Sequence, residues 1–237
     1  MGDIPETVRT ALADVPVSGA RCLEAGAGVG HTTAGLVSEG AAHVTAVTNN
    51  ADHAATVTDR FAEEESVATL LGDLRSLPLP DDAVDLVTAH GLCNVVTPSE
   101  LTPIVAELTR VTAPDGWLVV DDYDPLDGPV RELFGLANAV GELRDSRPPY
   151  TFYPREHVRA LVTAHGWAHE RTKTLLDPIP WTPDLLDDHA ALIRDDLATL
   201  PDDLADALAT RVEQVRDRAG DGVETGVMYS LAFRLPA

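Results

Sequence analysis

The stretch Leu23–Thr33, LEAGAGVGHTT, decides the fold class. Its three glycines, Gly26, Gly28 and Gly30, follow an apolar run and precede a helical pattern. Glycine adopts the tight backbone of such a turn at no steric cost and leaves room beside the chain. The stretch therefore predicts a strand, a glycine-rich loop and a helix that together hold a ligand. The alternative is a tight turn that binds nothing.

The spacing of the glycines narrows the chemistry of that ligand. A dinucleotide fingerprint requires Gly-x-Gly-x-x-Gly, but its third glycine position falls on His31. Free N–H groups at the start of the following helix favour an anionic group. Glu24, at the end of the strand, can face a cation. A ligand with an ammonium group, a carboxylate and a nucleoside fits better than one with a pyrophosphate.

Short apolar runs alternate with helical patterns along the chain. We predict strands at RCLEAG, HVTAVT, VATLLGD, VDLVTAH and GWLVVDD, with helices between them at HTTAGLVSEG, ADHAATVTDRFAEE and PSELTPIVAELTRVT. Further helices are predicted over 128–145, 155–166 and 184–219, and further strands over 167–176 and 226–236.

This alternation predicts an α/β fold. We expect a doubly wound, mostly parallel seven-stranded sheet with helices on both faces. We also expect one domain over 1–237, with a cofactor-binding half over 1–122 and a substrate-side half over 123–237.

The composition bounds the class of protein. The 237 residues are 44% hydrophobic, which is enough for a substantial core. No apolar run approaches the roughly 18 residues of a membrane span, and MGDIPETVRT does not have the pattern of a secretory signal. Two cysteines, Cys22 and Cys93, make neither a disulfide framework nor a complete zinc site. We therefore expect a protein of a reduced cytoplasm, and we expect Cys22 to lie in the core.

The charge is strongly negative, with 17 Lys and Arg against 39 Asp and Glu and a formal net charge of −22. The acidic residues recur along the whole chain, and Lys173 is its one lysine. Such a composition resembles that of proteins from extreme halophiles, because molar salt screens the self-repulsion. An ordinary acidic protein is the alternative.

From Arg21 to Asp122 the sequence resembles the class I S-adenosylmethionine-dependent methyltransferases, whose first motif is an acidic residue before a glycine triplet, here LEAGAGVG. The resemblance implies a Rossmann-like fold, methyl transfer and S-adenosyl-L-methionine as cofactor. The cofactor-binding positions it implies are Glu24, Ala25, Gly26, Gly28, Thr48, Asn49, Asp73, Leu74 and His90.

Three of these positions have more specific implied roles. Asp73 accepts a hydrogen bond from the adenine amino group, Leu74 packs beside the ring, and His90 lies beneath the sulfonium. The alternatives are a helix cap at Asp73 and a packed loop residue at His90.

One position departs from the family pattern. The second strand of such proteins ends in an acidic residue that holds the ribose hydroxyls, whereas this chain has Thr48 and Asn49 there. A neutral amide makes weaker hydrogen bonds than a carboxylate. The departure predicts weaker cofactor binding, a need for a partner, or loss of binding.

Methyl transfer needs few catalytic side chains, because the sulfonium of the cofactor already activates the methyl group. A general base is needed only where the acceptor carries a proton that must leave. His90 and Tyr123 are the candidate catalytic residues. Contacts to the acceptor are expected from loops above the carboxyl ends of the strands, at Asn94, Arg147, Tyr150, Tyr153 and the neighbouring Phe152.

Several of these residues have a second interpretation. Arg147 could hold a carboxylate or phosphate, or it could form a surface ion pair. Trp181, between two prolines, is the tryptophan most suited to line a pocket. Asp121, Asp122 and Asp124 could suit magnesium or calcium, but in so acidic a chain we expect a solvated cluster and no metal.

The acceptor stays open between a small metabolite and a tRNA, rRNA or translation component. The Asn/Asp-Pro-Pro-aromatic motif of many amino-methylating members is absent, and HGLCNVV stands in its place. Two other functions remain: a catalytically silent subunit that serves a partner, and an aminopropyl-type transferase that uses the same cofactor.

The third predicted strand suggests a partner. In this fold it usually lies at the sheet edge, and Val67, Thr69 and Leu71 alternate with Ala68 and Leu70, so both of its faces are mostly apolar. An exposed apolar edge invites pairing. Some class I methyltransferases that act on RNA or translation factors cover this edge with a small zinc-binding activator, and Leu92–Asn94 resembles an rRNA-methylating member. We therefore expect such an activator here, the alternative being cover by local helices and the RSLPLP loop.

Overall fold

A seven-stranded sheet forms the centre of the computed structural model, which describes residues 4–237. The strand order is β3-β2-β1-β4-β5-β9-β6. The strands are β1 (Arg21–Ala25), β2 (His43–Thr48), β3 (Val67–Leu71), β4 (Val84–His90), β5 (Thr112–Tyr123), β6 (Ala168–Leu176) and β9 (Met228–Arg234). The strands β1 to β5 pair in parallel, and β9 is antiparallel to both of its neighbours. The predicted doubly wound, mostly parallel sheet is confirmed.

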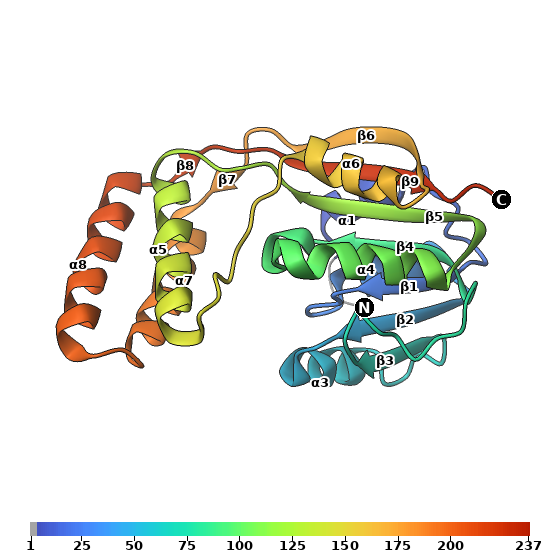
Figure 1. Cartoon of the computed structure of the whole chain (residues 1–237), viewed down its shortest axis with the longest axis horizontal. Coiled ribbons are helices and arrows are strands. Elements are labelled where there is room, and N and C mark those ends of the chain that lie inside the picture. Colours follow the sequence, from blue (N-terminus) through green and yellow to red (C-terminus); the bar gives the residue numbers. More distant parts are fainter. Residues whose placement is uncertain (1–3) are drawn as a thin grey trace.

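Helices cover both faces of the sheet (Figure 1). One face carries α1 (Glu6–Leu12), α2 (His31–Ser38) and α3 (Ala51–Arg60), and the other carries α4 (Pro98–Val111) and α6 (Arg155–Ala164). A short 3-10 turn, η1 (Cys93–Val95), follows β4. Each face has its own hydrophobic cluster, and Cys22 is buried in the first of them, as expected.

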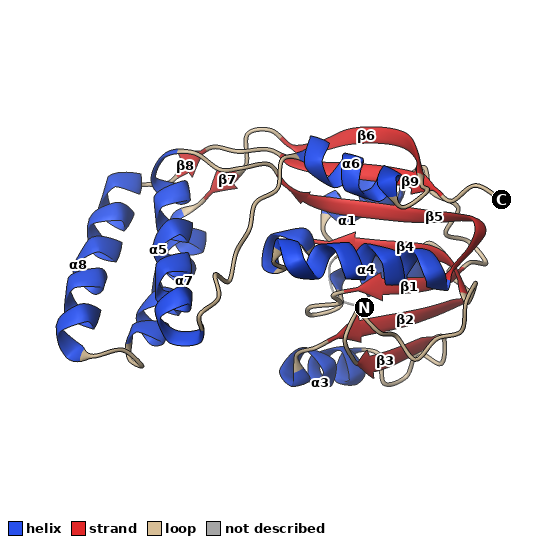
Figure 2. Ribbon diagram, viewed as in Figure 1, coloured by secondary structure: helices blue, strands red, loops and turns tan. Residues whose placement is uncertain are grey.

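Three helices form a lobe beside the sheet (Figure 2). They are α5 (Gly128–Asp145), α7 (Pro183–Leu197) and α8 (Asp202–Ala219), and the two short strands β7 (Pro180–Trp181) and β8 (Val223–Glu224) join them. The lobe has a hydrophobic cluster of its own, in which Trp181 is buried. Trp181 therefore packs inside the lobe and lines neither of the two pockets described below. The prediction of one domain over 1–237 stays a prediction.

The helical region predicted over 184–219 is interrupted. It is two helices, α7 and α8, with a break over 198–201. Pro201 precedes α8 as its N-cap residue, and proline within a helix removes a backbone donor and clashes with the preceding turn. The break lets α8 turn back and pack against α5 and α7.

Helix α4 is held at its start and along one face. Leu101, Ile104 and Leu108 are buried against the sheet at helical spacing. At the start, Thr97 and Glu100 form a capping box, in which Glu100 Oε2 accepts from Thr97 N at 2.9 Å. The cap fixes Glu100 at the carboxyl edge of the sheet, where it also takes part in the candidate site.

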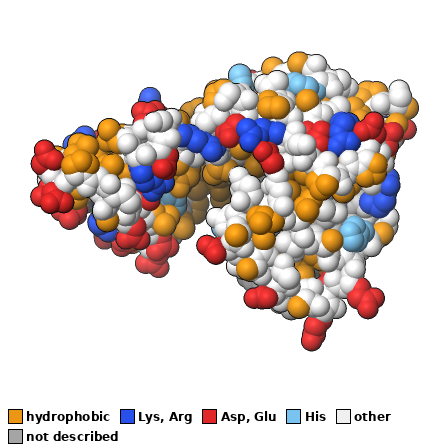
Figure 3. All heavy atoms as spheres, turned by 60° about the horizontal axis from the view of Figure 1, so that its bottom comes forward, with side chains coloured by type: hydrophobic (Ala, Val, Ile, Leu, Met, Phe, Trp, Pro, Cys, Tyr) orange, Lys and Arg blue, Asp and Glu red, His pale blue; other side chains and the backbone are white. Residues whose placement is uncertain are grey.

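Acidic side chains are spread over both the lobe and the sheet domain (Figure 3). Figure 3 also shows a hollow between these two parts of the molecule. Within residues 4–237, no helix has the length and apolar character needed to cross a bilayer.

Candidate cofactor and acceptor site

A cavity of about 620 Å³ lies at the carboxyl ends of the parallel strands. The glycine-rich loop, the ends of β2 and β4 and the segment after β3 form its sheet side. The start of α4, the end of α5 and the segment after α5 form the rest. Ligands of open α/β sheets bind in this position, outside the carboxyl ends of the strands.

The cavity brings together most of the residues that the resemblance assigned to the cofactor. Those that line it are Gly26, Gly28, Thr48, Asn49, Asp73, Leu74 and His90. Glu24 and Ala25 lie behind the loop and are buried, with exposed fractions of 2% and 0%.

The glycine-rich loop has a backbone that demands glycine. Gly26 and Gly28 have φ values of 83° and 52°, in the left-handed region that most side chains avoid. The N–H groups of Gly26 and Ala27 both donate to Val47 O at 2.9 Å, which ties the loop to β2. A Cβ placed on Gly28 would meet no atom within 4 Å. Gly28 therefore keeps open space beside the backbone, as a close-fitting ligand requires.

Glu24 is a buried carboxylate directly under this loop. The Thr33 hydroxyl donates a hydrogen bond to Glu24 Oε2. Burial raises the pKa of Glu24 to about 7, although the hydrogen bond from Thr33 and the nearby His90 act in the opposite direction. A cation placed beside such a carboxyl group would favour its ionised form and would be attracted by the resulting charge.

We expect Glu24→Gln to make the folded chain less sensitive to alkaline pH. The pKa of Glu24 is 4.5 as a free side chain and about 7 in the folded chain, so its contribution to stability is lost as the pH rises from the first value through the second. Above that range the wild-type chain has lost roughly 3 kcal/mol of its free energy of unfolding. In the variant, the amide donor without a partner costs about 1–3 kcal/mol at every pH, so it lowers stability without making it depend on pH. Urea unfolding at pH 5 and pH 8 measures it. The same fall in stability between these pH values in both proteins would contradict the account of Glu24.

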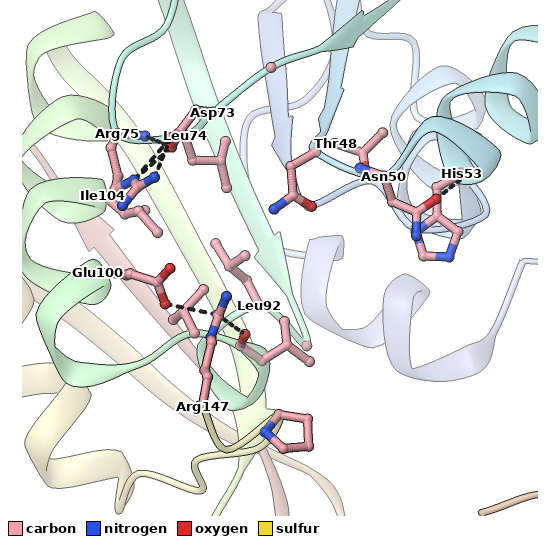
Figure 4. A pocket seen from close by; sticks show the side chains of 18 of the residues that line it. Thr48, Asn50, His53, Asp73, Leu74, Arg75, Leu92, Glu100, Ile104 and Arg147 are labelled. Atoms are coloured by element: carbon pink, nitrogen blue, oxygen red, sulfur yellow. Dashed lines mark hydrogen bonds and ion pairs between the residues drawn. The ribbon is translucent and has the colours of Figure 1, made fainter. Parts of the chain in front are cut away.

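The end of β2 forms one wall of the cavity (Figure 4). Thr48 is buried and its hydroxyl accepts from Asn50 N at 3.2 Å. Asn50 in turn caps α3, since its Oδ1 accepts from Asp52 N and His53 N. Asn49 is exposed at the cavity and makes no side-chain hydrogen bond within the described chain. Asn49 is therefore the free polar group at the position where the family pattern has a carboxylate.

Two ion pairs form the opposite wall (Figure 4). Asp73 accepts hydrogen bonds from the Arg75 guanidinium, which lower the pKa of Asp73 to about 2. The Arg75 pairing does not support the alternative of a helix cap at Asp73, although Asp73 Oδ1 also accepts from Arg75 N. Arg147 donates to Glu100 Oε2 at 2.8 Å and to Val95 O at 3.3 Å.

Several residues of the cavity were not predicted from the sequence. Among them are His53, Arg75, Val95, Glu100, Ile104, Arg144 and Pro149. The Thr97-x-x-Glu100 spacing does mark a helix start, which in this fold lies at the edge that carries the cavity. No local pattern marks Arg144 or Pro149, because they reach the cavity through the packing of the lobe.

His90 contacts a buried acidic pair at the end of β4. His90 Nδ1 lies 3.1 Å from Asp121 Oδ2. Burial opposes the charged imidazole, but the hydrogen bond and charge of Asp121 outweigh it and raise the pKa of His90. Burial also raises the pKa of Asp122 to about 6, against the hydrogen bonds from Tyr123 N and Asn94 N.

The expectation of a solvated acidic cluster at this point is wrong. Asp121 and Asp122 are only 3% and 1% exposed, because both lie near the end of β5, an interior strand of the sheet. Asp124, just beyond, is paired with Arg155. Among residues 4–237 no group of three or more His, Cys, Asp or Glu side chains has the arrangement of a metal site.

The structure separates the predicted acceptor-binding and catalytic residues. Arg147 lines the cavity, whereas Tyr150 lines a smaller neighbouring pocket and packs edge-on against Phe134. Pro149 lines both, so the two pockets adjoin. Phe152 packs against Phe134 in the lobe.

Three predicted residues do not line the cavity. Tyr153 is buried in the core, where its hydroxyl donates to Val96 O at 3.1 Å. Tyr123 packs against the lobe. Asn94 uses its backbone to bond Asp122 and Thr151. The segment over 150–153 packs partly in the lobe, through Tyr150, and partly in the core of the sheet, through Tyr153. Neither tyrosine therefore lines the cavity.

Comparison with known proteins finds a family model that is similar to part of the chain. Residues 23–120 match the family model of the methyltransferase domain. The match supports the methyltransferase resemblance that the sequence of this part of the chain shows.

Two relatives are similar in sequence. A demethylmenaquinone methyltransferase of Clavibacter sepedonicus is 36% identical over 117 residues, which cover 49% of this chain and 46% of that protein. The uncharacterized methyltransferase YcgJ of Bacillus subtilis is 33% identical over 129 residues, 53% of this chain and 48% of that protein. The matches thus span about half the length of each relative.

Solved structures show the same fold over nearly the whole chain. The crystal structure of YcgJ aligns with a TM-score of 0.67 and 20% identity and covers 98% of both chains. A chain from the Haloferax volcanii complex that contains the Trm112 methyltransferase activator aligns with a TM-score of 0.61 and 16% identity over 98% of this chain and 90% of that chain.

Proposed function

We propose that the chain transfers the methyl group of S-adenosyl-L-methionine to an acceptor. The observation that carries the proposal is the cavity itself, where the glycine-rich loop, the end of β2, Asp73–Leu74 and His90 meet. Bound there, the sulfonium would supply the electrophilic methyl carbon. The open space at Gly28 and the buried carboxylate of Glu24 suit the methionine part of that molecule.

Product analysis tests this proposal. The chain is incubated in molar KCl with S-adenosylmethionine and with small-molecule extracts, tRNA or rRNA, and the nucleoside product is identified. Methyl transfer releases S-adenosylhomocysteine, whereas aminopropyl transfer releases methylthioadenosine. Binding of the cofactor without either product, in all mixtures, would favour the catalytically silent subunit.

The ribose position offers a gain-of-function prediction. Asn49→Asp is expected to tighten binding of S-adenosylmethionine by about 1 kcal/mol, roughly a fivefold lower Kd, because charged hydrogen bonds to the ribose hydroxyls are stronger. Asn50→Asp is the matched control, because it adds the same charge at the adjacent residue while aspartate can still cap α3. Thr48→Asp is a poorer choice, since Thr48 is buried and bonded to Asn50 N. Unchanged or weaker binding in Asn49→Asp would mean that the ribose is held elsewhere.

The acceptor side is proposed to lie between α4 and the lobe. Arg147 is half-exposed and its pair with Glu100 is of the kind worth at most about 1 kcal/mol. An acceptor carboxylate or phosphate could therefore replace Glu100 as its partner at little cost. Tyr150 and the adjoining apolar pocket would contact the remainder of the acceptor. Tyr123, Asn94 and Tyr153 have no part in this proposal.

We propose that the chain works in the cytoplasm of a halophile. The support is the net charge of −22 and the presence of a single lysine in the whole sequence. Self-repulsion destabilises a surface of this charge, and salt screens that repulsion.

We also propose a small zinc-binding activator at the sheet edge. Among residues 4–237, β3 is an edge strand that pairs with β2 alone, and Leu71 on it is 57% exposed. An unpaired apolar edge is suited to strand addition by a partner. The Haloferax volcanii neighbour, whose complex contains an activator, makes such a partner a reasonable candidate.

Leu71→Lys is expected to release this activator while leaving the chain folded. The exposed side chain can carry a charge without disturbing the core, and Leu185→Lys on the lobe, at 43% exposure and outside both pockets, is the control. Co-purification from the host, with the partner identified by its size and zinc content, measures the effect. A monomer that is stable and fully active alone in high salt would contradict the proposal.

A further inference from the structure

His90 and Asp121 are cross-strand partners. They occupy the same register position on the parallel strands β4 and β5. Gly91 N donates to Asp121 O at 2.7 Å, which fixes the backbones of the two residues relative to each other. His90 Nδ1 and Asp121 Oδ2, 3.1 Å apart, are thus held together by the sheet and not by flexible loops.

The hydrogen bond sets the tautomer of the imidazole. An ionised carboxylate only accepts, so Nδ1 must donate and the neutral ring must carry its lone pair on Nε2. No hydrogen bond to His90 Nε2 occurs within residues 4–237. The ring lines the cavity with 25% of its side chain exposed. A free proton acceptor is therefore available at the cavity wall.

Three carboxylates face this ring. Asp121 is its hydrogen-bond partner, and the charges of Glu24 on β1 and Asp122 on β5 also act on it. All three are almost fully buried, and Asp121 Oδ1 has no hydrogen-bond partner among the described residues. A positive charge on His90 is stabilised here, as a group that must accept a proton requires.

We propose that His90 Nε2 accepts a proton from the methyl acceptor and that Asp121 is the residue that positions His90 for this step. The acceptor class is then one whose reacting oxygen or nitrogen carries a proton at neutral pH, such as a phenolic or enolic hydroxyl or an amine. This inference rests on the proposed function and adds to it the kind of acceptor.

The step balances within the groups named. The acceptor's O–H or N–H bond breaks and its proton passes to His90 Nε2. The electron pair of the acceptor atom forms the bond to the methyl carbon, and the pair of the broken S–CH₃ bond stays on sulfur. The hydrogen bond to Asp121 stabilises the imidazolium of His90 until His90 releases the proton to water.

Nitrogen-15 NMR of the histidine rings tests the positioning role without an acceptor. His90→Gln identifies the His90 signals. In the wild-type protein we expect neutral His90 with a proton on Nδ1 and none on Nε2. Asp121→Asn is expected to mix the two tautomers and to lower the pKa of His90. Asp122→Asn is the matched control: it removes a nearby buried charge but not the hydrogen bond, so it should keep the tautomer.

Kinetics test the catalytic role with a phenol, a primary amine and a thiol as probe acceptors. With a hydroxyl or amine acceptor, His90→Gln is expected to lower kcat by about 100-fold or more, and Asp121→Asn to move the acidic limb of the pH profile. A thiol that is already ionised at the assay pH has no proton to lose, so His90→Gln should methylate it at nearly the wild-type rate. An Nε2-protonated ring in the wild-type protein, or an unchanged kcat and pH profile in His90→Gln, would overturn the inference. Failure of the wild-type chain to bind S-adenosylmethionine would instead overturn the proposed function.

Discussion

Gly28→Asp is expected to abolish binding of S-adenosylmethionine while the chain stays folded. The residue has φ = 52° and open space where its Cβ would stand, and aspartate is among the residues that tolerate this backbone region. The new carboxylate would occupy the space proposed for the ligand's own carboxylate, and two like charges brought together cost several kcal/mol. We expect Kd to rise by at least about 100-fold, since that corresponds to about 3 kcal/mol.

The control for this variant is Gly28→Asn, which adds nearly the same bulk without the charge. It should bind more tightly than Gly28→Asp, and both should melt close to the wild-type temperature. Gly30 offers a contrast, because a Cβ there would approach Phe61 to 2.8 Å and disturb the packing of α3. Normal binding by folded Gly28→Asp would show that the glycine-rich loop does not hold the ligand.

A steep rise of thermal stability with salt is the second large effect expected. The formal charge of −22 repels itself across the surface. The Debye length falls from about 10 Å at 0.1 M to about 3 Å at 1 M salt. The ion pairs weaken as well, but those of the structure are mostly half-exposed and contribute little individually. Relief of the repulsion therefore dominates.

The expected change is measurable by calorimetric melting in KCl between 0.1 M and 2 M. A gain on the order of 3 kcal/mol raises the melting temperature of a chain of this length by about 10 °C. Sucrose is the control, because it stabilises by exclusion from the surface and screens no charge. A melting temperature that does not change with KCl would remove the argument for a halophilic host.

The strands of the sheet were predictable because the sequence signal for each one lies within the strand itself. Each of the five parallel strands is a short apolar run that ends in a polar or glycine residue, and helix α4 between the last two has a clear apolar face. The glycine-rich loop was also predictable, since positive φ at Gly26 and Gly28 restricts the choice of residue. The break before α8 had a signal too, in Pro201.

The burial of Asp121 and Asp122 was not predictable in the same way. Their run, DDYD, looks like the other acidic runs of a chain with 39 Asp and Glu. What separates it is the partner on the neighbouring strand, since His90 stands opposite Asp121. That pairing depends on strand order and register, which no local pattern encodes.

The acceptor side was the least predictable part of the site. Tyr150, Phe152 and Tyr153 stand close together in the sequence, yet Tyr153 is in the main core while the other two pack in the lobe. Arg144 and Pro149 reach the cavity only because α5 ends there. The docking of the lobe determines these positions, and it arises from contacts between segments far apart in the sequence.

Titration calorimetry with S-adenosylmethionine and S-adenosylhomocysteine in 2 M KCl measures directly whether the cavity binds this cofactor. We expect saturable binding of both at one site per chain, competition between them, and loss of both in Gly28→Asp but not in the exposed lobe variant Leu185→Lys, which lies outside both pockets. Absence of binding of either molecule to the folded wild-type chain, alone and with any partner that co-purifies, would contradict this expectation.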